Sequence, residues 1–184
     1  MAADGLGLAV ADIARTILDG IIDHFDAVNA ACAAADRVAL PRRRVIAPGN
    51  PRLIAWDCEQ LVVTMSGIGI GTAPGEGGLP ASRGNPISAT GMRHAVFAVQ
   101  IVRCVPESSD GTSPPPDDVL TNAGLVFMRE AGLLSQALVN ICTKVKDGLP
   151  GGSRVTPGAV ETLGPEGAFA ANEGSLAVTV GQLV

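Results

Sequence analysis

The residues best suited to chemistry in this chain lie together in the stretch "WDCE". Trp56 is the single tryptophan, and Asp57, Cys58 and Glu59 follow it directly. A cysteine becomes a nucleophile when a base activates its thiol, and His94 is the histidine that could serve as that base. Activation needs an exposed thiolate within hydrogen-bond reach of the imidazole, and the sequence establishes neither condition. We therefore favour a structural cysteine at the start of a strand over a catalytic residue.

The two carboxylates of this stretch alternate along a strand, so Asp57 and Glu59 would project to one face. Such a pair can transfer protons or hold a cation. It can equally keep a strand end soluble or meet the arginines of a partner, and we favour this second interpretation. The run "RRR" opens the preceding predicted strand, where charge discourages edge-to-edge aggregation. The residues expected at a subunit or partner interface are Arg42, Arg43, Arg44, Asp57 and Glu59.

The glycine-rich stretch "GIGIGTAPG" does not meet the requirements of a phosphate-binding loop. Thr72 stands where the third glycine of GxGxxG is needed, and neither a helix start nor a GK[ST] sequence follows. We interpret this stretch as a flexible strand end.

The four cysteines show no metal-binding pattern. No CxxC occurs, and neither histidine stands at metal-ligand spacing from a cysteine. No metal or cofactor is therefore expected. All four lie in apolar contexts, where free cysteines behave as small hydrophobic residues, so we expect free thiols and a reducing compartment during folding. The four are Cys32, Cys58, Cys104 and Cys142.

The composition fits one domain with an aliphatic core. The chain has 184 residues, of which 47% are hydrophobic and only 3% aromatic. A net charge of −5 disfavours binding to nucleic acid, because phosphates would be repelled. The start of the chain lacks the basic segment of a signal peptide, and no uninterrupted apolar run reaches membrane-spanning length. We expect no association with membranes.

Hydrophobic periodicity predicts two long helices and about five strands. The helices are expected at 6–35 and 118–146, with Asp117 or Asp118 capping the second. The strands are expected at 42–47, 53–71, 94–105, 158–163 and 175–184, with a bulge at Ser66–Gly67. The 94–105 strand is apolar on both faces and should be central. The apolar stripe of the second helix is expected to consist of Ala123, Val126, Phe127, Leu134, Leu138, Ile141 and Val145.

This order of elements predicts an α+β fold: a mixed or antiparallel sheet of about four to five strands with two long helices on one face. Residues 1–184 would form a single domain with long loops at 71–92 and 106–116. Loops of this length are usually functional or disordered.

The order of short motifs resembles the tail-terminator, or neck, proteins of long-tailed actinobacterial phages. The resemblance rests on a basic strand with a "PG" turn at 43–48, "AWDCEQLVV" at 55–63, and a strand ending "RCVP" at 102–106 before a long helix. These motifs cover about a tenth to a sixth of the chain, and the order of helices and strands extends them.

The resemblance implies a virion structural protein that is not an enzyme and has no cofactor. Such a subunit forms a ring, expected to be hexameric, that caps the tail tube, stops its polymerisation and joins the tail to the head connector. Its partners would be other copies of itself, the tail tube protein and the connector or stopper protein. DNA would pass through the lumen without specific binding. The protein would be assembled in the bacterial cytoplasm and reside in the neck of the virion.

Three alternatives stay open. The chain could be a head–tail stopper or adaptor of the same neck, or a small thiol enzyme that uses Cys58 and His94. It could also be an α+β domain that binds a small molecule, because a sequence does not reveal pockets.

Overall fold

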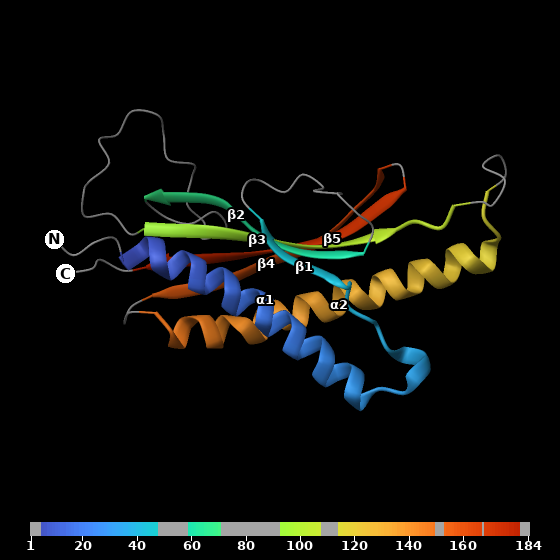
Figure 1. Ribbon diagram of the computed structural model, residues 1–184, viewed down its shortest axis with the longest axis horizontal. Helices are drawn as coiled ribbons and strands as arrows, with labels where there is room; N and C mark the ends of the chain where they lie inside the picture. Colours follow the sequence, from blue (N-terminus) through green and yellow to red (C-terminus); the bar gives the residue numbers. More distant parts are fainter. Residues whose placement is uncertain are drawn as a thin grey trace.

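Two helices and a five-stranded sheet make up the part of the chain that the computed structural model describes, residues 5–47, 59–70, 93–107, 114–149, 153–166 and 168–180 (Figure 1). The helices are α1 (Gly5–Ala31) and α2 (Asp117–Asp147), with a short 3-10 turn, η1, at Ala34–Asp36. The strands are β1 (Arg43–Ala47), β2 (Gln60–Ile70), β3 (Arg93–Cys104), β4 (Arg154–Glu166) and β5 (Phe169–Val180). Their order across the sheet is β1-β2-β3-β5-β4, in which only β1 and β2 run parallel. The α+β prediction is confirmed.

Both helices lie on the same side of the sheet in Figure 1. α1 packs under β1 and β2, and α2 packs under β4 and β5, while the two helices also contact each other. The core forms where every second residue of the strands meets the buried faces of the helices. Its fully buried members include Ile17, Ile21, Phe25, Leu61, Phe97, Ile101, Leu134, Leu138 and Leu176. This aliphatic core is what the composition indicated.

The two helices approach each other closely at Gly20. A Cβ atom on Gly20 would lie 2.7 Å from Cγ1 of Ile141, so only hydrogen fits there. The end of α1 is held to the chain that follows it: Asn29 Nδ2 donates to the Val38 carbonyl at 2.8 Å, and the Val38 N–H donates to Asn29 Oδ1 at 2.9 Å. These contacts position the start of β1 beside the helices.

The central strand and the bulge follow the prediction. β3 lies in the middle of the sheet, between β2 and β5. The β2–β3 register shifts between Met65 and Gly67, as the predicted bulge requires. Leu61 and Val63 face the core, as their alternation indicated.

The last two strands are longer than predicted. β5 begins at Phe169, whereas the polar composition of residues 164–174 indicated a connection. The polar residues are accommodated because Asn172 bonds to α2 and Glu173 accepts from Gln100 on β3. Gly174 is required in the strand, because a Cβ there would lie 2.5 Å from Cδ1 of Leu138. Tertiary contacts thus override the weak strand propensity.

The helix ends differ in detail from the prediction. α1 ends at Ala31, and η1 occupies part of the alanine-rich segment. Pro116 is the N-cap of α2 without a side-chain cap, so Asp117 and Asp118 lie in the first turn, where carboxylates suit the helix dipole. Val126, predicted in the buried stripe, is exposed because nothing in the described residues covers that part of α2.

The prediction of four free cysteines is wrong. Cys104, at the end of β3, is disulfide-bonded, and its partner lies outside the described residues. Cys32 and Cys142 are free and half-buried, and Cys58 belongs to the part not described. The apolar flanks of Cys104 misled the prediction, because they reflect the central strand and not the exposed position of its last residue.

By length and composition alone, α2 could also cross a membrane. A helix packed on a protein core passes the same test. In this structure the face of α2 that carries Glu130, Leu134 and Leu138 is buried against the protein's own sheet. The loops predicted at 71–92 and 106–116 fall wholly or largely outside the described residues.

Candidate functional site

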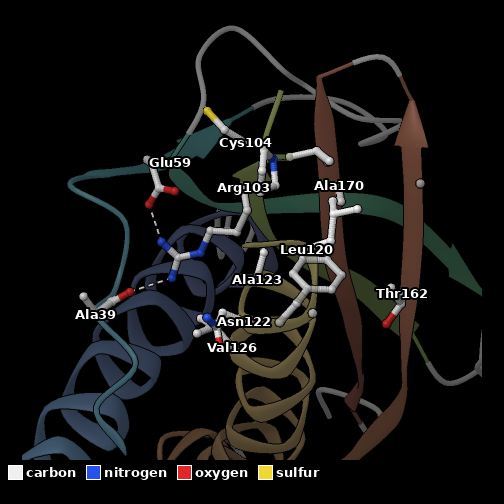
Figure 2. Close-up of a pocket in the computed structure, with 15 residues that line it drawn as sticks. Ala39, Glu59, Arg103, Cys104, Leu120, Asn122, Ala123, Val126, Thr162 and Ala170 are labelled. Atoms are coloured by element: carbon white, nitrogen blue, oxygen red, sulfur yellow. Dashed lines mark hydrogen bonds and ion pairs between the residues drawn. The ribbon is translucent and has the colours of Figure 1, made fainter. Parts of the chain in front are cut away.

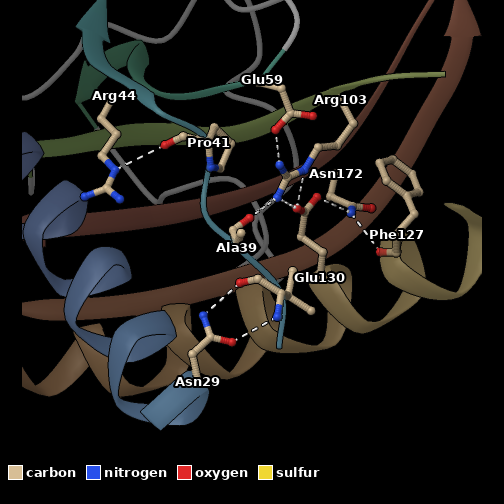
Figure 3. Close-up of polar contacts among 10 residues, drawn as sticks. Asn29, Ala39, Pro41, Arg44, Glu59, Arg103, Phe127, Glu130 and Asn172 are labelled. Carbon is tan, nitrogen blue, oxygen red and sulfur yellow. Dashed lines mark hydrogen bonds and ion pairs between the residues drawn. The ribbon is translucent and has the colours of Figure 1, made fainter. Parts of the chain in front are cut away.

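A polar cluster centred on Arg103 joins the end of β3 to α2 (Figure 3). Arg103 Nε donates to Glu130 Oε2 at 2.7 Å, and its Nη2 donates to the same carboxylate. Its Nη1 pairs with Glu59 just before β2, while Nη2 also donates to the Ala39 carbonyl. One guanidinium therefore connects four parts of the chain.

The second half of the cluster comes from β5. Asn172 Nδ2 donates to the Phe127 carbonyl at 3.0 Å and to Glu130 Oε1 at 3.1 Å. Thr162 on β4 donates its hydroxyl to Asn172 Oδ1 at 3.1 Å. Both carboxylate oxygens of the fully buried Glu130 thus accept hydrogen bonds, as a buried charge requires.

Burial dominates the electrostatics of Glu130. Loss of hydration raises the pKa of its carboxyl above the ordinary value, while the charge and hydrogen bonds of Arg103 and the bond from Asn172 act in the opposite direction. With both oxygens hydrogen-bonded and the side chain fully buried, this carboxylate is suited to holding α2 against the sheet.

A pocket of about 590 Å³ opens beside this cluster, between the first half of α2 and the neighbouring ends of β3, β4 and β5 (Figure 2). Arg103 and Glu59 supply a polar wall, with 15% and 49% of their side chains exposed. The rest of the lining is mostly apolar and includes Leu120, Ala123, Val126, Phe127 and Ala170. The pocket can therefore receive an apolar group that carries a polar or charged end.

The first half of α2 exposes apolar side chains on more than one of its faces, because Leu120 and Val126 line the pocket whereas Leu125 and Met128 do not. Val119, Leu120, Leu125, Val126 and Met128 are all exposed, and Met128 retains 73% of its accessible surface. Grouped exposed hydrophobic side chains mark interaction surfaces more often than scattered ones do.

The predicted interface residues come together only in part. Arg43 pairs in register with Gln60, so the arginines of 42–44 and Glu59 occupy the same corner of the sheet. Arg42, Arg43 and Arg44 are exposed, and Glu59 pairs with Arg103 of its own chain. Glu59 also has a φ of 66°, in the left-handed region, where the chain turns into β2. Asp57 lies outside the described residues.

The candidate base of the thiol-enzyme alternative, His94, lies far from the start of β2, which is the described part of the chain that follows Cys58. His94 lies opposite Gly69 at one end of β2, whereas Gln60 forms the other end. Nine residues of strand separate these ends by about 30 Å. Cys58 lies outside the described residues, close in sequence to Gln60. The separation argues against a nucleophile–base pair.

Both histidines contact residues of the fold itself. His24 accepts or donates at Nδ1 with Asn140 Nδ2 at 3.2 Å, and burial lowers its pKa. The His94 ring lies over Gly69, where a Cβ would be 2.6 Å from Cε1. Within the described residues, no group of three potential metal ligands occurs.

Sequence reasoning missed Arg103, Glu130 and Asn172. The available signal was one carboxylate, next to Arg129, in a stretch of the second helix with no other charged residue, and an arginine at the end of a central apolar strand. No protein-family model matches the chain, and no curated protein is significantly similar to it.

Proposed function

We propose that this protein is a virion structural protein, a tail-terminator subunit that forms a ring on the end of a phage tail tube. The ring, expected to be hexameric, would stop polymerisation of the tube and join it to the head connector. The proposal draws on the resemblance of the motifs to neck proteins. The observation that carries it is the difference between the two edge strands: exposed arginines gather at the start of β1, whereas Glu161 is exposed on β4 at the opposite edge of the sheet.

The two edge strands differ in charge, although β4 also begins with an exposed arginine, Arg154. β1 lies at one edge, with exposed arginines at and before its start, and β4 lies at the other. Glu161 on β4 is exposed and stands directly opposite Glu173 on β5. Facing carboxylates repel each other, so a cation from outside would relieve this pair.

A ring requires each subunit to offer two different surfaces that fit each other. Within the described residues, β1 hydrogen-bonds only to β2, and β4 only to β5, so each has an open side. The arginines at the start of β1 in one copy can therefore meet Glu161 on β4 of the next. A contact between Glu59 and a neighbour's arginines is compatible only with a two-fold arrangement, because Glu59 shares a corner with its own arginines.

A charge exchange tests the ring contact. Glu161→Arg alone, or Arg42→Glu with Arg44→Glu, should abolish rings seen by electron microscopy and native mass spectrometry. Combining all three substitutions in one chain should restore them. Asp19→Arg on the exposed face of α1 is the control and should assemble normally. A protein that stays monomeric in the presence of tail tubes, with tube length unaffected, would contradict the proposal.

Within the same neck, a stopper or adaptor role predicts binding to the connector but no effect on tube length. Measuring tube length and connector binding with the same preparation separates the two roles.

The pocket supports a second candidate function, the binding of a small molecule. Its volume of about 590 Å³ falls in the range of ligand sites, and its lining is mostly apolar with a few polar groups. A fluorescent apolar anion such as anilinonaphthalene sulfonate should bind in the pocket of the wild type. The Ala123→Trp variant should lose this binding, because the larger side chain would fill the pocket. Unchanged binding in that variant would argue against the pocket as a ligand site.

A further inference from the structure

The outward face of α2 differs from that of α1, although both helices lie on the same side of the sheet. The exposed face of α1 is strongly charged and carries Asp12, Arg15, Asp19, Asp23 and Asp26. Between Val119 and Thr143, α2 has only two charged residues. Of these, Glu130 is buried, and Arg129 pairs with Asp36 at 3.3 Å. The exposed face of α2 is therefore uncharged along most of its length.

This face has the regular spacing of a helix-pairing seam. Exposed residues recur at steps of three and four, the spacing that keeps one stripe on one side of a helix. Leu125, Met128 and Val139 are the large apolar members, with 49%, 73% and 56% of their surface exposed. The full stripe is Thr121, Leu125, Met128, Gly132, Gln136, Val139 and Thr143. The buried stripe of α2 on the sheet is a separate one.

Among the described residues, no contact explains why position 132 is a glycine. It is exposed at the middle of α2, and a Cβ there would meet nothing within 4 Å. A glycine inside a helix costs roughly 0.5–1 kcal/mol relative to alanine. A second helix that crosses at Gly132 would account for this residue, because the absence of a side chain lets two helices approach closely.

We propose that α2 docks antiparallel onto α2 of a second copy of this chain, with the two-fold axis at Gly132. In such a pair, each residue before Gly132 faces the residue equally far after it. Leu125 then meets Val139 of the second copy, seven positions away on either side, and Thr121 meets Thr143. Leu125 and Val139 are thereby covered on both copies, and Met128 meets Gln136 of the second copy, four positions from Gly132 on either side.

Charge at the ends of the face selects the antiparallel orientation. Asp118 precedes Gly132 by fourteen positions, and Lys146 follows it by fourteen. Both are exposed, so the acidic start of one helix meets the basic end of the other. A parallel pair would place like charges together, which costs stability.

This contact is independent of the ring contact, which uses the sheet edges. Two-fold pairing of α2 would join two subunits, or two rings face to face. Loss of the α2 contact should leave ring formation intact, and loss of the edge contact should leave the two-fold dimer intact.

A cysteine at the crossing point tests the geometry in the full-length chain. Gly132→Cys should give a covalent dimer under mild oxidation, with the 132–132 link identified by mass spectrometry, because the two residues meet on the axis. Gly124→Cys is the matched control, since it lies on the same helix away from the axis, and it should give little dimer. Equal cross-linking of both variants would overturn the proposal.

Association in solution gives an independent measurement. By sedimentation, Leu125→Glu or Val139→Glu should raise the dimer dissociation constant by about tenfold or more, since each buries a charge in the apolar seam. Ile68→Glu, an exposed apolar residue on β2, should leave it unchanged. Asp118→Lys or Lys146→Glu should weaken the dimer, and the combination should restore it. A wild-type protein that is monomeric at all concentrations, or that floats with lipid vesicles through this face, would overturn the proposal.

Discussion

Arg103 on β3 and Glu130 on α2 form an ion pair across the boundary between the sheet and the helices. Glu130 is fully buried, and the side chain of Arg103 is 15% exposed. Removing one partner from such a pair leaves the other buried without compensation, which costs far more than the pair itself contributes. The pair is therefore a structural requirement of the fold even if it adds little net stability.

We expect Arg103→Leu to lower the free energy of unfolding by about 3–5 kcal/mol, because Glu130 would lose its compensating charge. Urea denaturation followed by circular dichroism measures the loss. The matched control is Arg129→Leu, which removes the exposed pair with Asp36 and should change stability by about 0.5 kcal/mol or less. Similar losses in both variants would show that Arg103 is not an essential partner of Glu130.

The raised pKa of Glu130 gives a pH-dependent prediction. A carboxyl whose pKa is higher in the folded state binds more protons there than in the unfolded state, so its contribution to stability falls as pH rises. The fall begins near the ordinary value of 4.5 and ends above the raised pKa of the folded protein. Glu130→Gln cannot titrate and should lack this part of the pH dependence.

The measurement compares the unfolding free energies of the wild type and Glu130→Gln at several pH values from 4 to 8. The unfolding free energy of Glu130→Gln minus that of the wild type should increase as pH rises. A constant difference over this range would mean that Glu130 titrates alike in the folded and unfolded states. Other carboxylates contribute equally to both proteins and cancel in the comparison.

Most of the fold could be predicted from the hydrophobic periodicity of the sequence. The two helices, the central position of β3 and the bulge after Met65 follow from local patterns, since a buried face leaves a regular apolar stripe. The start of β5 could not be predicted in this way. Asn172 and Gly174 have weak strand propensity, and they fit because α2 supplies a hydrogen-bond acceptor and a close-packed leucine.

The site was less accessible to prediction. Arg103, Glu130 and Asn172 lie far apart in sequence, and only the tertiary structure brings them together. Arg103 belongs to the "RCVP" motif, but that motif does not indicate its partners. Glu59 was identified as exposed and acidic, but its pairing with Arg103 depends on the left-handed turn before β2. The disulfide of Cys104 was missed because its apolar neighbours in the sequence are typical of a free, buried cysteine.

The cysteines predict a definite labelling pattern. When the unreduced protein is denatured and alkylated, Cys32 and Cys142 should be labelled and Cys104 should not. In the folded protein Cys142 should react slowly at neutral pH, because burial raises the pKa of its thiol and its Sγ donates to the Leu138 carbonyl at 3.1 Å. Peptide mass spectrometry measures both results. Labelling of Cys104 before reduction would contradict the disulfide, and addition of a reductant before alkylation is the positive control.

The contact of Gly20 with Ile141 predicts that a helix-favouring substitution will destabilise this protein. Alanine is a better helix former than glycine by roughly 1 kcal/mol, so Gly20→Ala would be stabilising in an isolated helix. Here the new methyl group would lie 2.7 Å from Ile141 Cγ1 and would push α1 away from α2. Overpacking of this kind typically costs about 1–3 kcal/mol, so the net effect should be a loss.

Gly124→Ala on α2 is the matched control for that substitution, because a Cβ there meets nothing within 4 Å. It should raise the free energy of unfolding by roughly 0.5–1 kcal/mol through helix propensity alone. Thermal or urea denaturation of the two variants should therefore give shifts of opposite sign. If Gly20→Ala stabilises the protein as much as Gly124→Ala does, the two helices do not make the close approach seen at Ile141. Two double variants test the contact further. Ile141→Val keeps Cγ1, so adding it to Gly20→Ala should recover little of the lost stability. Ile141→Ala removes Cγ1, so Gly20→Ala should cost less stability in the Ile141→Ala background than in the wild type.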